Sequence, residues 1–444
     1  MSARNAAVAL LLLGCSSSGS PARVANQAAE GGSAAAGNAS GGAGNSPGGA
    51  GNSPGGTGNT SGGANSSGGA QNTEGPITYG GAVSCGPSVK GGTPGGSSGV
   101  VDEWQNVTPA GINLDSANNN FGVQDVLVDP VRPSDLYTFV CFQGVWKSTD
   151  FGVTWGKINK GTNGDKIDSG KPWGEAIDTN RCRDPKTPPT LYSAGSQGGF
   201  WTSKDGGVSW AMTNLPEDGK PRPQDGYNVD VDPYNSQHLI VGFHEQTGVA
   251  ESLDGGSTFR SIKHDPGMDI GSSFYAFFID TGAPETTAKV WLLISQAGSN
   301  AGTWRTTDGG SSWKQVSKNE HNHGQSQIYQ RNGVVYMGGV YANEGWGVLR
   351  SKDLGATWEH LGSGAAQGVI YGTEKNIYAQ NPGASAGLVD QSGSQRAAQP
   401  GDTWTTWNLK MSNGPKHAAV TFDGSHYIIV GGNWNAGIWR YVEP

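Results

Sequence analysis

Acidic side chains that could act as a pair recur along the chain after residue 102. Acid–base cleavage of a glycosidic bond needs two carboxyl groups facing each other across a cleft, one protonated and one ionised. Five acidic residues near predicted strand starts or loop tips are candidates for catalysis: Asp125, Glu175, Asp225, Glu245 and Glu344. The sequence alone does not decide which two would form the pair.

Aromatic, amide and imidazole groups accompany these carboxylates. The candidates for ligand binding are Trp173, Tyr227, Asn228, His323, Gln325, His417 and Trp434. This mixture suits sugars, whose hydroxyl groups need donors and acceptors and whose ring faces stack on aromatic side chains. Polar residues are also common at strand starts because those places meet water, so both interpretations stand for each residue.

Histidines and tyrosines of the same region allow a second chemistry. A polysaccharide lyase would use a His or Tyr base and would neutralise a uronate, and five residues could serve: Tyr227, His244, His323, Lys416 and His417. No metal-ligand spacing such as HExxH or CxxC occurs, and no phosphate loop or nucleotide motif is present. We therefore expect no metal and no cofactor.

An internal repeat indicates which structural elements must position these residues. The unit follows the pattern Ser/Thr-x-Asp-x-Gly-x-Thr/Ser-Trp, with Phe in place of Trp in one copy. Clean copies occur at 148–155, 203–210, 252–259, 306–313 and 351–358, and a worn copy occurs at 400–407. The Asp carboxylate can accept backbone N–H groups across a turn, Gly supplies a positive φ, and Trp packs between neighbouring sheets.

This unit resembles the Asp-box, or BNR, repeat of sialidase-like, xyloglucanase-like and sortilin-like propellers. In such propellers the box lies between the third and fourth strands of a blade, and ligands meet the opposite face, where the innermost strands begin. The resemblance therefore gives the repeated Asp residues a structural role. It directs attention to the predicted inner-strand starts, including 119–125, 171–175 and 225–228.

The spacing of the repeats predicts the fold. The repeated Asp residues, from Asp150 to Asp402, lie 45 to 55 residues apart, as expected for one four-stranded blade per repeat. A further blade is expected from pairing Gly437–Val442 with Glu103–Thr108 near the start of the domain, which would close the ring. The fold class is thus all-β, a single seven-bladed β-propeller, with six or eight blades as alternatives.

Two family comparisons can be weighed against the residues. The Arg-Ile-Pro motif of many sialidases is absent, which disfavours sialidase activity. The Asp-Pro turns that precede the repeat, at Asp129 and Asp232, resemble those of xyloglucanases over most of 121–360. Those enzymes join two propellers around their cleft, and one is expected here.

The N-terminal part of the chain resembles a bacterial lipoprotein leader. An apolar run ends in Leu12-Leu13-Gly14-Cys15, too short for a membrane-spanning helix, which predicts a signal peptide at 1–14 and lipidation of Cys15. Residues 15–101 are rich in Gly, Ser and Asn and predict a disordered tether. The propeller is expected over 102–444.

Charge and cysteine content limit the partners. The formal net charge of −8 excludes the basic footprint of a nucleic-acid binder. Beyond Cys15, three cysteines allow at most one intrachain disulfide, with Cys85, Cys141 and Cys182 as possible partners. We expect an exported monomer, on the cell surface or in the periplasm, that contacts the membrane only through its lipid.

The favoured function is a glycoside hydrolase acting on an extracellular polysaccharide. The alternatives are a non-catalytic propeller that binds a glycan or a protein, and a polysaccharide lyase. Fold alone does not separate these classes, because propellers host both enzymes and binding modules.

Overall fold

The computed structural model describes residues 99–195, 199–216, 226–244, 248–262, 274–295, 301–318, 328–340, 347–360, 370–380, 392–397, 405–408, 415 and 417–444. The chain divides into two units, Met1–Thr73 and Glu74–Pro444, and every described residue belongs to the second. The predicted signal peptide and nearly all of the predicted tether lie outside the described residues, and so does Cys15.

Seven four-stranded antiparallel sheets make up the described part of the chain. Sheet 1 contains β2 (Val123–Val128), β3 (Leu136–Val140), β4 (Gly144–Ser148) and β5 (Gly156–Lys157). Sheet 2 contains β6 (Gly174–Ile177), β7 (Leu191–Ala194), β8 (Phe200–Ser203) and β9 (Ala211–Thr213). Sheet 3 contains β10 (Gly226–Val231), β11 (Leu239–Phe243), β12 (Val249–Ser252) and β13 (Arg260–Ile262). Sheet 4 contains β14 (Phe274–Phe278), β15 (Trp291–Ser295), β16 (Gly302–Thr306) and β17 (Lys314–Ser317).

The remaining sheets follow the same order. Sheet 5 contains β18 (Ile328–Arg331), β19 (Val334–Val340), β20 (Gly347–Ser351) and β21 (Glu359–His360). Sheet 6 contains β22 (Ile370–Gly372), β23 (Asn376–Gln380), β24 (Ser392–Ala397) and β25 (Thr405–Asn408). Sheet 7 contains β26 (His417–Phe422), β27 (Tyr427–Asn433), β28 (Gly437–Val442) and β1 (Gln105–Asn106). The helices among the described residues are short: a 3-10 helix at Ala117–Asn119, α1 (Gly164–Asp168) and α2 (Pro284–Thr287).

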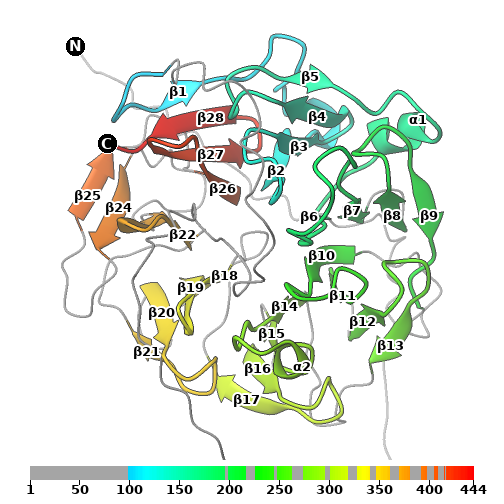
Figure 1. Cartoon of the computed structure of the whole chain (residues 1–444), viewed down its shortest axis with the longest axis vertical. Coiled ribbons are helices and arrows are strands. Elements are labelled where there is room, and N and C mark those ends of the chain that lie inside the picture. The colour runs from blue at the N-terminus through cyan, green and yellow to red at the C-terminus, as the bar shows by residue number, and fades with distance from the viewer. Residues whose placement is uncertain are drawn as a thin grey trace, which may run out of the picture. The chain divides into compact units, whose positions relative to one another are not determined.

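The first strand of each sheet lies nearest the centre of the ring, and the last strand lies at its rim (Figure 1). Neighbouring sheets pack face to face through apolar side chains. On β2, Val126 packs with Ile428 and Val430 of sheet 7, whereas Leu127 packs with Leu191 of sheet 2. This alternation follows from the two-residue period of a strand. The prediction of an all-β propeller is confirmed.

Sheet 7 joins both ends of the described chain. Gln105 and Asn106 of β1 pair with Arg440 and Trp439 of β28, and the Val107 N–H donates to the Ile438 carbonyl oxygen at 2.9 Å. The predicted pairing of the two ends is confirmed. It leaves β28 with a partner on both sides, so this sheet has no open edge at its C-terminal strand.

The clean repeats form the same turn between the third and fourth strands of sheets 1 to 5. In the first copy, Asp150 Oδ1 accepts the backbone N–H of Val153 at 3.1 Å and of Thr154 at 2.9 Å. The Ser148 hydroxyl donates to Asp150 at 2.7 Å, and the turn passes through positive φ at Phe151 and Gly152. The turn mechanism expected from the residue types is confirmed in these copies. The worn copy falls largely outside the described residues.

The structure decides one of the disulfide pairings that the sequence left open. Cys182 is disulfide-bonded, whereas Cys141 is a buried thiol that takes no part in a disulfide. The possible Cys141–Cys182 bond is therefore wrong. Cys85 lies outside the described residues.

Candidate functional site

An arc of aromatic rings follows the starts of the inner strands from sheet 7 to sheet 4. The Trp173 ring centroid lies 5.0 Å from that of Phe121 and 5.9 Å from that of Tyr227, which in turn lies 5.0 Å from that of Tyr275. Trp434, in the turn between β27 and β28, meets Phe121 edge to face at 6.3 Å. Three of the predicted ligand-binding residues therefore belong to one continuous arc.

Only part of this arc is accessible. Phe121, Trp173 and Trp434 are half-buried, whereas Tyr227 and Tyr275 are 2% and 3% exposed. His244 is also buried and stacks on Trp173, with ring centroids 6.5 Å apart. The surface that a ligand could stack on is thus formed by Phe121, Trp173 and Trp434, while Tyr227 supports it from below.

Asp125 and His417 meet at the same end of the ring. Asp125 is the third residue of β2, and His417 opens β26 of the adjacent sheet. His417 Nδ1 contacts Asp125 Oδ1, and the Val126 N–H donates to the same oxygen at 2.8 Å. The Asp125 side chain is nearly buried, and that of His417 is about a quarter exposed. The pair combines a carboxylate with an imidazole that it orients, an arrangement suited to proton transfer.

Glu175 lies on β6, the inner strand next to that of Asp125. Leu127 and Ile177 pack in one apolar cluster between sheets 1 and 2. Asp125 and Glu175 precede these two residues by two positions and lie near the starts of β2 and β6, where the Asp125 side chain contacts His417 of sheet 7. Glu175 is buried, and its Oε1 accepts a hydrogen bond from the Ser193 hydroxyl at 3.2 Å. Sequence reasoning left the pair unassigned, and these two candidates lie near the starts of neighbouring inner strands.

Asn228 holds two sheets together. Its Nδ2 donates to the Ala276 carbonyl oxygen at 2.7 Å, and its Oδ1 accepts the N–H groups of Ala276 and Gly242 at 2.9 and 3.2 Å. This amide is thus used by the backbone of β14 and β11, and the side chain is buried. The structure gives the predicted ligand-binding residue Asn228 the role of a clamp between the inner strands of sheets 3 and 4.

Asp230 continues this clamp and was not singled out from the sequence. Its Oδ2 accepts the Phe278 N–H at 2.7 Å, two residues further along both strands than the Asn228 contact. The pKa of Asp230 is raised to about 7, because desolvation, helped by the Asp232 charge, outweighs the lowering by the Phe278 and Val231 N–H groups. A perturbed carboxyl can mark an active site. Here the contacts of Asp230 join two inner strands, so its role is structural. No pattern in the neighbouring sequence predicts these contacts.

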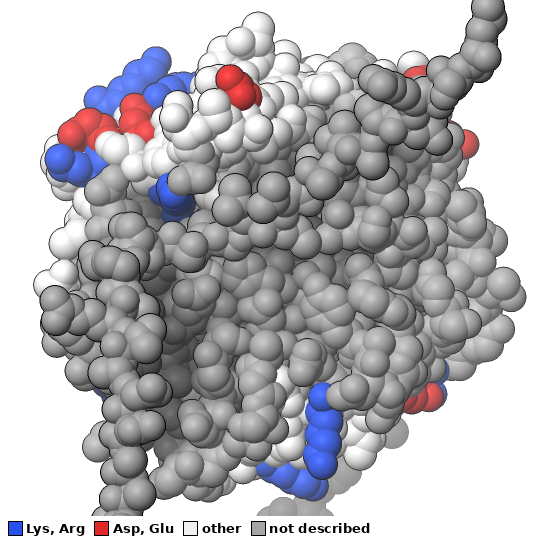
Figure 2. Space-filling view, turned by 180° about the vertical axis from the view of Figure 1, so that it is seen from behind, with Lys and Arg blue, Asp and Glu red and all other residues white. Residues whose placement is uncertain are grey.

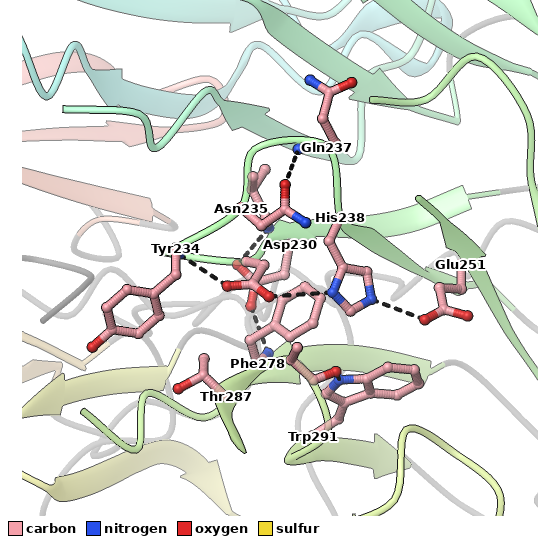
Figure 3. Close-up of polar contacts among 12 residues, drawn as sticks. Asp230, Tyr234, Asn235, Gln237, His238, Glu251, Phe278, Thr287 and Trp291 are labelled. Atoms are coloured by element: carbon pink, nitrogen blue, oxygen red, sulfur yellow. Dashed lines mark hydrogen bonds and ion pairs between the residues drawn. The ribbon is translucent and has the colours of Figure 1, made fainter. Parts of the chain in front are cut away.

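The opposite end of sheet 3 carries a buried ionic network (Figure 3). His238 Nδ1 lies 3.2 Å from Asp232 Oδ2, and His238 Nε2 lies 2.9 Å from Glu251 Oε1, which Arg260 also approaches through the second Glu251 oxygen at 2.5 Å. Burial lowers the pKa of His238, but hydrogen bonds to Asp232 and Glu251 and their charges outweigh burial and raise it. Asp232 lies five residues beyond Tyr227, about 17 Å along the strand. This network is therefore separate from the aromatic arc.

The other predicted site residues cannot be placed. Asp225, Glu245, Glu344, His323 and Gln325 lie outside the described residues. Among the described residues, no group of three or more His, Cys, Asp or Glu side chains could hold a metal ion. None of the described helices is both long enough and apolar enough to cross a membrane.

Comparisons with known proteins relate the chain to xyloglucanases. No family model matches the chain. A xyloglucanase of Hypocrea jecorina is 24% identical over 326 residues, which cover 62% of this chain and 36% of that protein. A protein of Neosartorya fischeri named "Probable oligoxyloglucan-reducing end-specific xyloglucanase" is 26% identical over 216 residues, 48% of this chain and 24% of that protein. The chain thus matches about a quarter to a third of these relatives' length.

Solved structures support the fold. The GH74 xyloglucanase from Xanthomonas campestris superposes with a TM-score of 0.51 at 16% identity, over 76% of this chain and 53% of that chain. The structure of U3-55K gives the same TM-score at 8% identity, over 77% of this chain and 98% of that chain. These likenesses concern the fold alone. Together with the sequence matches, they make this chain a β-propeller related to part of the GH74 xyloglucanases.

Proposed function

We propose that this chain is an exported, lipid-anchored glycoside hydrolase that acts on an extracellular polysaccharide. One observation carries the proposal: Asp125 and Glu175 lie near the starts of neighbouring inner strands, beside half-buried aromatic rings, in a propeller related by sequence to xyloglucanases. In this proposal the seven sheets are the blades of one ring, and the repeated turns are Asp boxes on the face away from the substrate.

The contacts of the two carboxylates suggest their roles. Asp125 accepts contacts from His417 and the Val126 N–H, which suits an ionised carboxylate acting as base or nucleophile. Glu175, buried beside the Ser193 hydroxyl, is proposed as the acid that protonates the leaving oxygen. Phe121 and Trp173 would stack against sugar rings and hold the scissile bond over the pair.

Two other functions are favoured by particular observations. The contact between His417 and Asp125 would equally suit a polysaccharide lyase, in which imidazole removes a proton from a uronate. The half-buried rings of Phe121, Trp173 and Trp434 would also suit a propeller that binds glycan or protein without cleaving it. Both are alternatives to hydrolysis on the same surface.

The decisive experiment incubates the whole chain with plant, algal and bacterial polysaccharides. New reducing ends and the ultraviolet absorbance of unsaturated uronates are followed together. Reducing ends without absorbance support the hydrolase, and absorbance supports the lyase. Retention on a glycan or protein partner with neither signal identifies a binding propeller.

Two substitutions then test the proposed pair. Asp125→Asn and Glu175→Gln should each lower kcat by about 10²–10⁴-fold while the unfolding midpoint changes little. Glu285→Gln, on α2 between β14 and β15, is the matched control and should leave kcat unchanged. Full activity of both site variants would exclude Asp125 and Glu175 as the catalytic pair.

The lipid anchor has its own test. Expression in a bacterial host with an alkyne-tagged fatty acid should label the chain, and Cys15→Ser should abolish the label and release the protein from membranes. Membrane association that survives this substitution would argue against an anchor at Cys15.

A further inference from the structure

We infer that the polysaccharide is anionic and that Lys171 binds its charged group. This inference rests on the proposed function, because it names the class of sugar at the same end of the ring. It is carried by an aromatic patch, defined as Phe121, Phe142, Trp173 and Trp434, and by the ammonium group that lies among these rings.

Two rings of the patch are held in strained backbone positions. Phe142, in the turn between β3 and β4, has φ +59° and is 37% exposed, and Trp434, in the turn between β27 and β28, has φ +40°. Bulky residues rarely adopt positive φ, which costs on the order of 1–3 kcal/mol at each position. Such strain is typical of ligand-binding surfaces, where the surrounding structure holds a residue in a conformation that it would not otherwise adopt.

Backbone hydrogen bonds fix both turns. The Phe142 N–H donates to the Gly170 carbonyl oxygen at 2.9 Å, directly before Lys171. Trp434 exchanges two backbone hydrogen bonds with Val123, at 2.7 and 2.9 Å. The patch therefore spans three neighbouring sheets and has little freedom to rearrange. A ligand that binds it would lose little binding free energy to the ordering of these side chains.

Lys171 lies between two of these rings. Its Nζ is 5.5 Å from the centroid of Phe121 and 5.5 Å from the centroid of Phe142. Lys147 provides an internal comparison: its Nζ lies 5.1 Å from the Tyr137 ring and also 2.8 Å from Asp135 Oδ2. Within the described chain Lys171 has no such carboxylate, and its side chain is half-buried.

At some other places on the described surface, lysines lie beside carboxylates. Figure 2 shows acidic and basic side chains next to one another at one corner of that face. Lys157 pairs with Asp168 at 2.8 Å, and Lys352 pairs with Glu359 at 3.1 Å. Lys171 instead lies beside the rings of Phe121 and Phe142, and no described carboxylate forms an ion pair with it.

An anionic sugar fits the whole arrangement. Its ring face can stack on Trp173 or Phe121, and its carboxylate or sulfate can take the place that Asp135 has beside Lys147. The Lys171 charge would also offset the repulsion between an acidic sugar and the carboxylates of Asp125 and Glu175. A neutral polysaccharide would leave the ammonium group without a counter-charge beneath the ligand.

The test measures binding of the whole chain by affinity electrophoresis. The probes are polygalacturonate, alginate and a sulfated galactan, each run beside its carboxyl-reduced or desulfated form. At least one charged form should bind about tenfold more tightly than its neutral counterpart, the size of one partly desolvated charge contact. Preference for the sulfated probe over both uronates would identify sulfate as the anion and support the same inference.

Variants separate charge from stacking. Lys171→Gln should abolish the preference for the charged form, Lys171→Arg should retain it, and Lys160→Gln is the matched control on an exposed lysine outside the patch. The preference should also fall as salt rises. A preference unchanged in Lys171→Gln would overturn the inference.

Different results would overturn the anionic-sugar inference and the proposed function. Binding or cleavage of neutral and charged forms alike would overturn the anionic-sugar inference and leave the proposed function intact. Silence toward every polysaccharide, with the chain folded, would overturn both.

Discussion

At the scale of single residues, the repeated Asp turn concentrates several hydrogen bonds on one side chain. Asp308 accepts the Ser312 N–H at 2.8 Å, the Ser312 hydroxyl at 2.6 Å and the Thr306 hydroxyl at 2.8 Å. Burial is the largest single effect and raises the pKa of Asp308, but the hydrogen bonds together lower this pKa by more, so the net shift is downward. The carboxylate acts as a cap for a turn, in the way that Asp caps a helix.

Asp308→Ala should therefore lower the free energy of unfolding by about 1–2 kcal/mol, measured in urea. Asp165→Ala is the control, because Asp165 is exposed on α1 and its one ion pair among the described residues is a 3.6 Å contact with Lys166. The control should stay within about 0.5 kcal/mol of the wild type. Equal losses in the two variants would mean that the turn does not depend on its Asp.

His238 gives sheet 3 a pH-dependent stability. Its pKa is raised in the folded protein, so the imidazolium contribution is fully present below the unfolded value, near 6.5, and is lost as pH rises through the folded value. Comparing wild type with His238→Gln between pH 5.5 and 8.5 should show the largest advantage of the wild type at the acid end. An advantage independent of pH would show that His238 is neutral throughout.

At the scale of elements, the inner strands approach so closely that some positions admit only glycine. A Cβ at Gly174, the first residue of β6, would lie 2.3 Å from the Asn228 Cα atom and 2.7 Å from the Tyr227 carbonyl oxygen. Both contacts are backbone of β10 and cannot rotate away. This close approach positions Trp173 against Tyr227.

Gly174→Ala should destabilise the protein by about 1–3 kcal/mol and weaken ligand binding, because sheets 2 and 3 must separate. Gly156→Ala is the matched control, since a Cβ there meets nothing within 4 Å. Urea unfolding and near-ultraviolet circular dichroism of the tryptophans would report both effects. A Gly174→Ala protein as stable as the control would contradict the observed spacing.

The sequence predicted the turns, which depend on neighbouring residues, and missed side-chain contacts that depend on distant ones. The turn at Asp150 is determined by residues within four positions, and it was foreseen with its hydrogen bonds. The clamp at Asn228 depends on Ala276, 48 residues away, so its amide resembled a ligand-binding group. Phe142 was missed for a similar reason, because its role depends on Lys171 of the next sheet.

At the scale of the whole molecule, the ring closes through contacts between its two ends. β1 pairs with β28, and the Tyr441 hydroxyl donates to Asp102 Oδ1 at 2.7 Å. The sequence predicted this closure, because 437–442 resembles a strand that enters a repeat and 103–108 resembles one that leaves it, and pairing the two leaves no open edge. Because the ring is closed, the stability of each described sheet depends on the others. Loss of contacts where the two ends pair should therefore destabilise the whole ring.

Glu443, just after β28, ties this joint to sheet 6. Its buried Oε1 accepts hydrogen bonds from the Thr373 hydroxyl at 2.8 Å, the Asn376 amide at 2.9 Å and the Tyr378 hydroxyl at 2.5 Å. Burial, and then the Glu443 charge, raises the pKa of Tyr378, so this phenol stays protonated and donates. Within the described structure, Glu443 Oε2 is buried and accepts nothing.

Glu443→Ala should lower the free energy of unfolding by about 2–4 kcal/mol, because three buried donors lose their acceptor. Glu443→Gln should cost much less, since its carbonyl oxygen can accept the same three hydrogen bonds and its NH₂ group replaces the unpartnered oxygen. Urea unfolding followed by both fluorescence and circular dichroism measures the loss and shows whether the ring still unfolds in one transition. If Glu443→Ala were as stable as Glu443→Gln, the contacts that close the ring would lie in β1 and β28 alone.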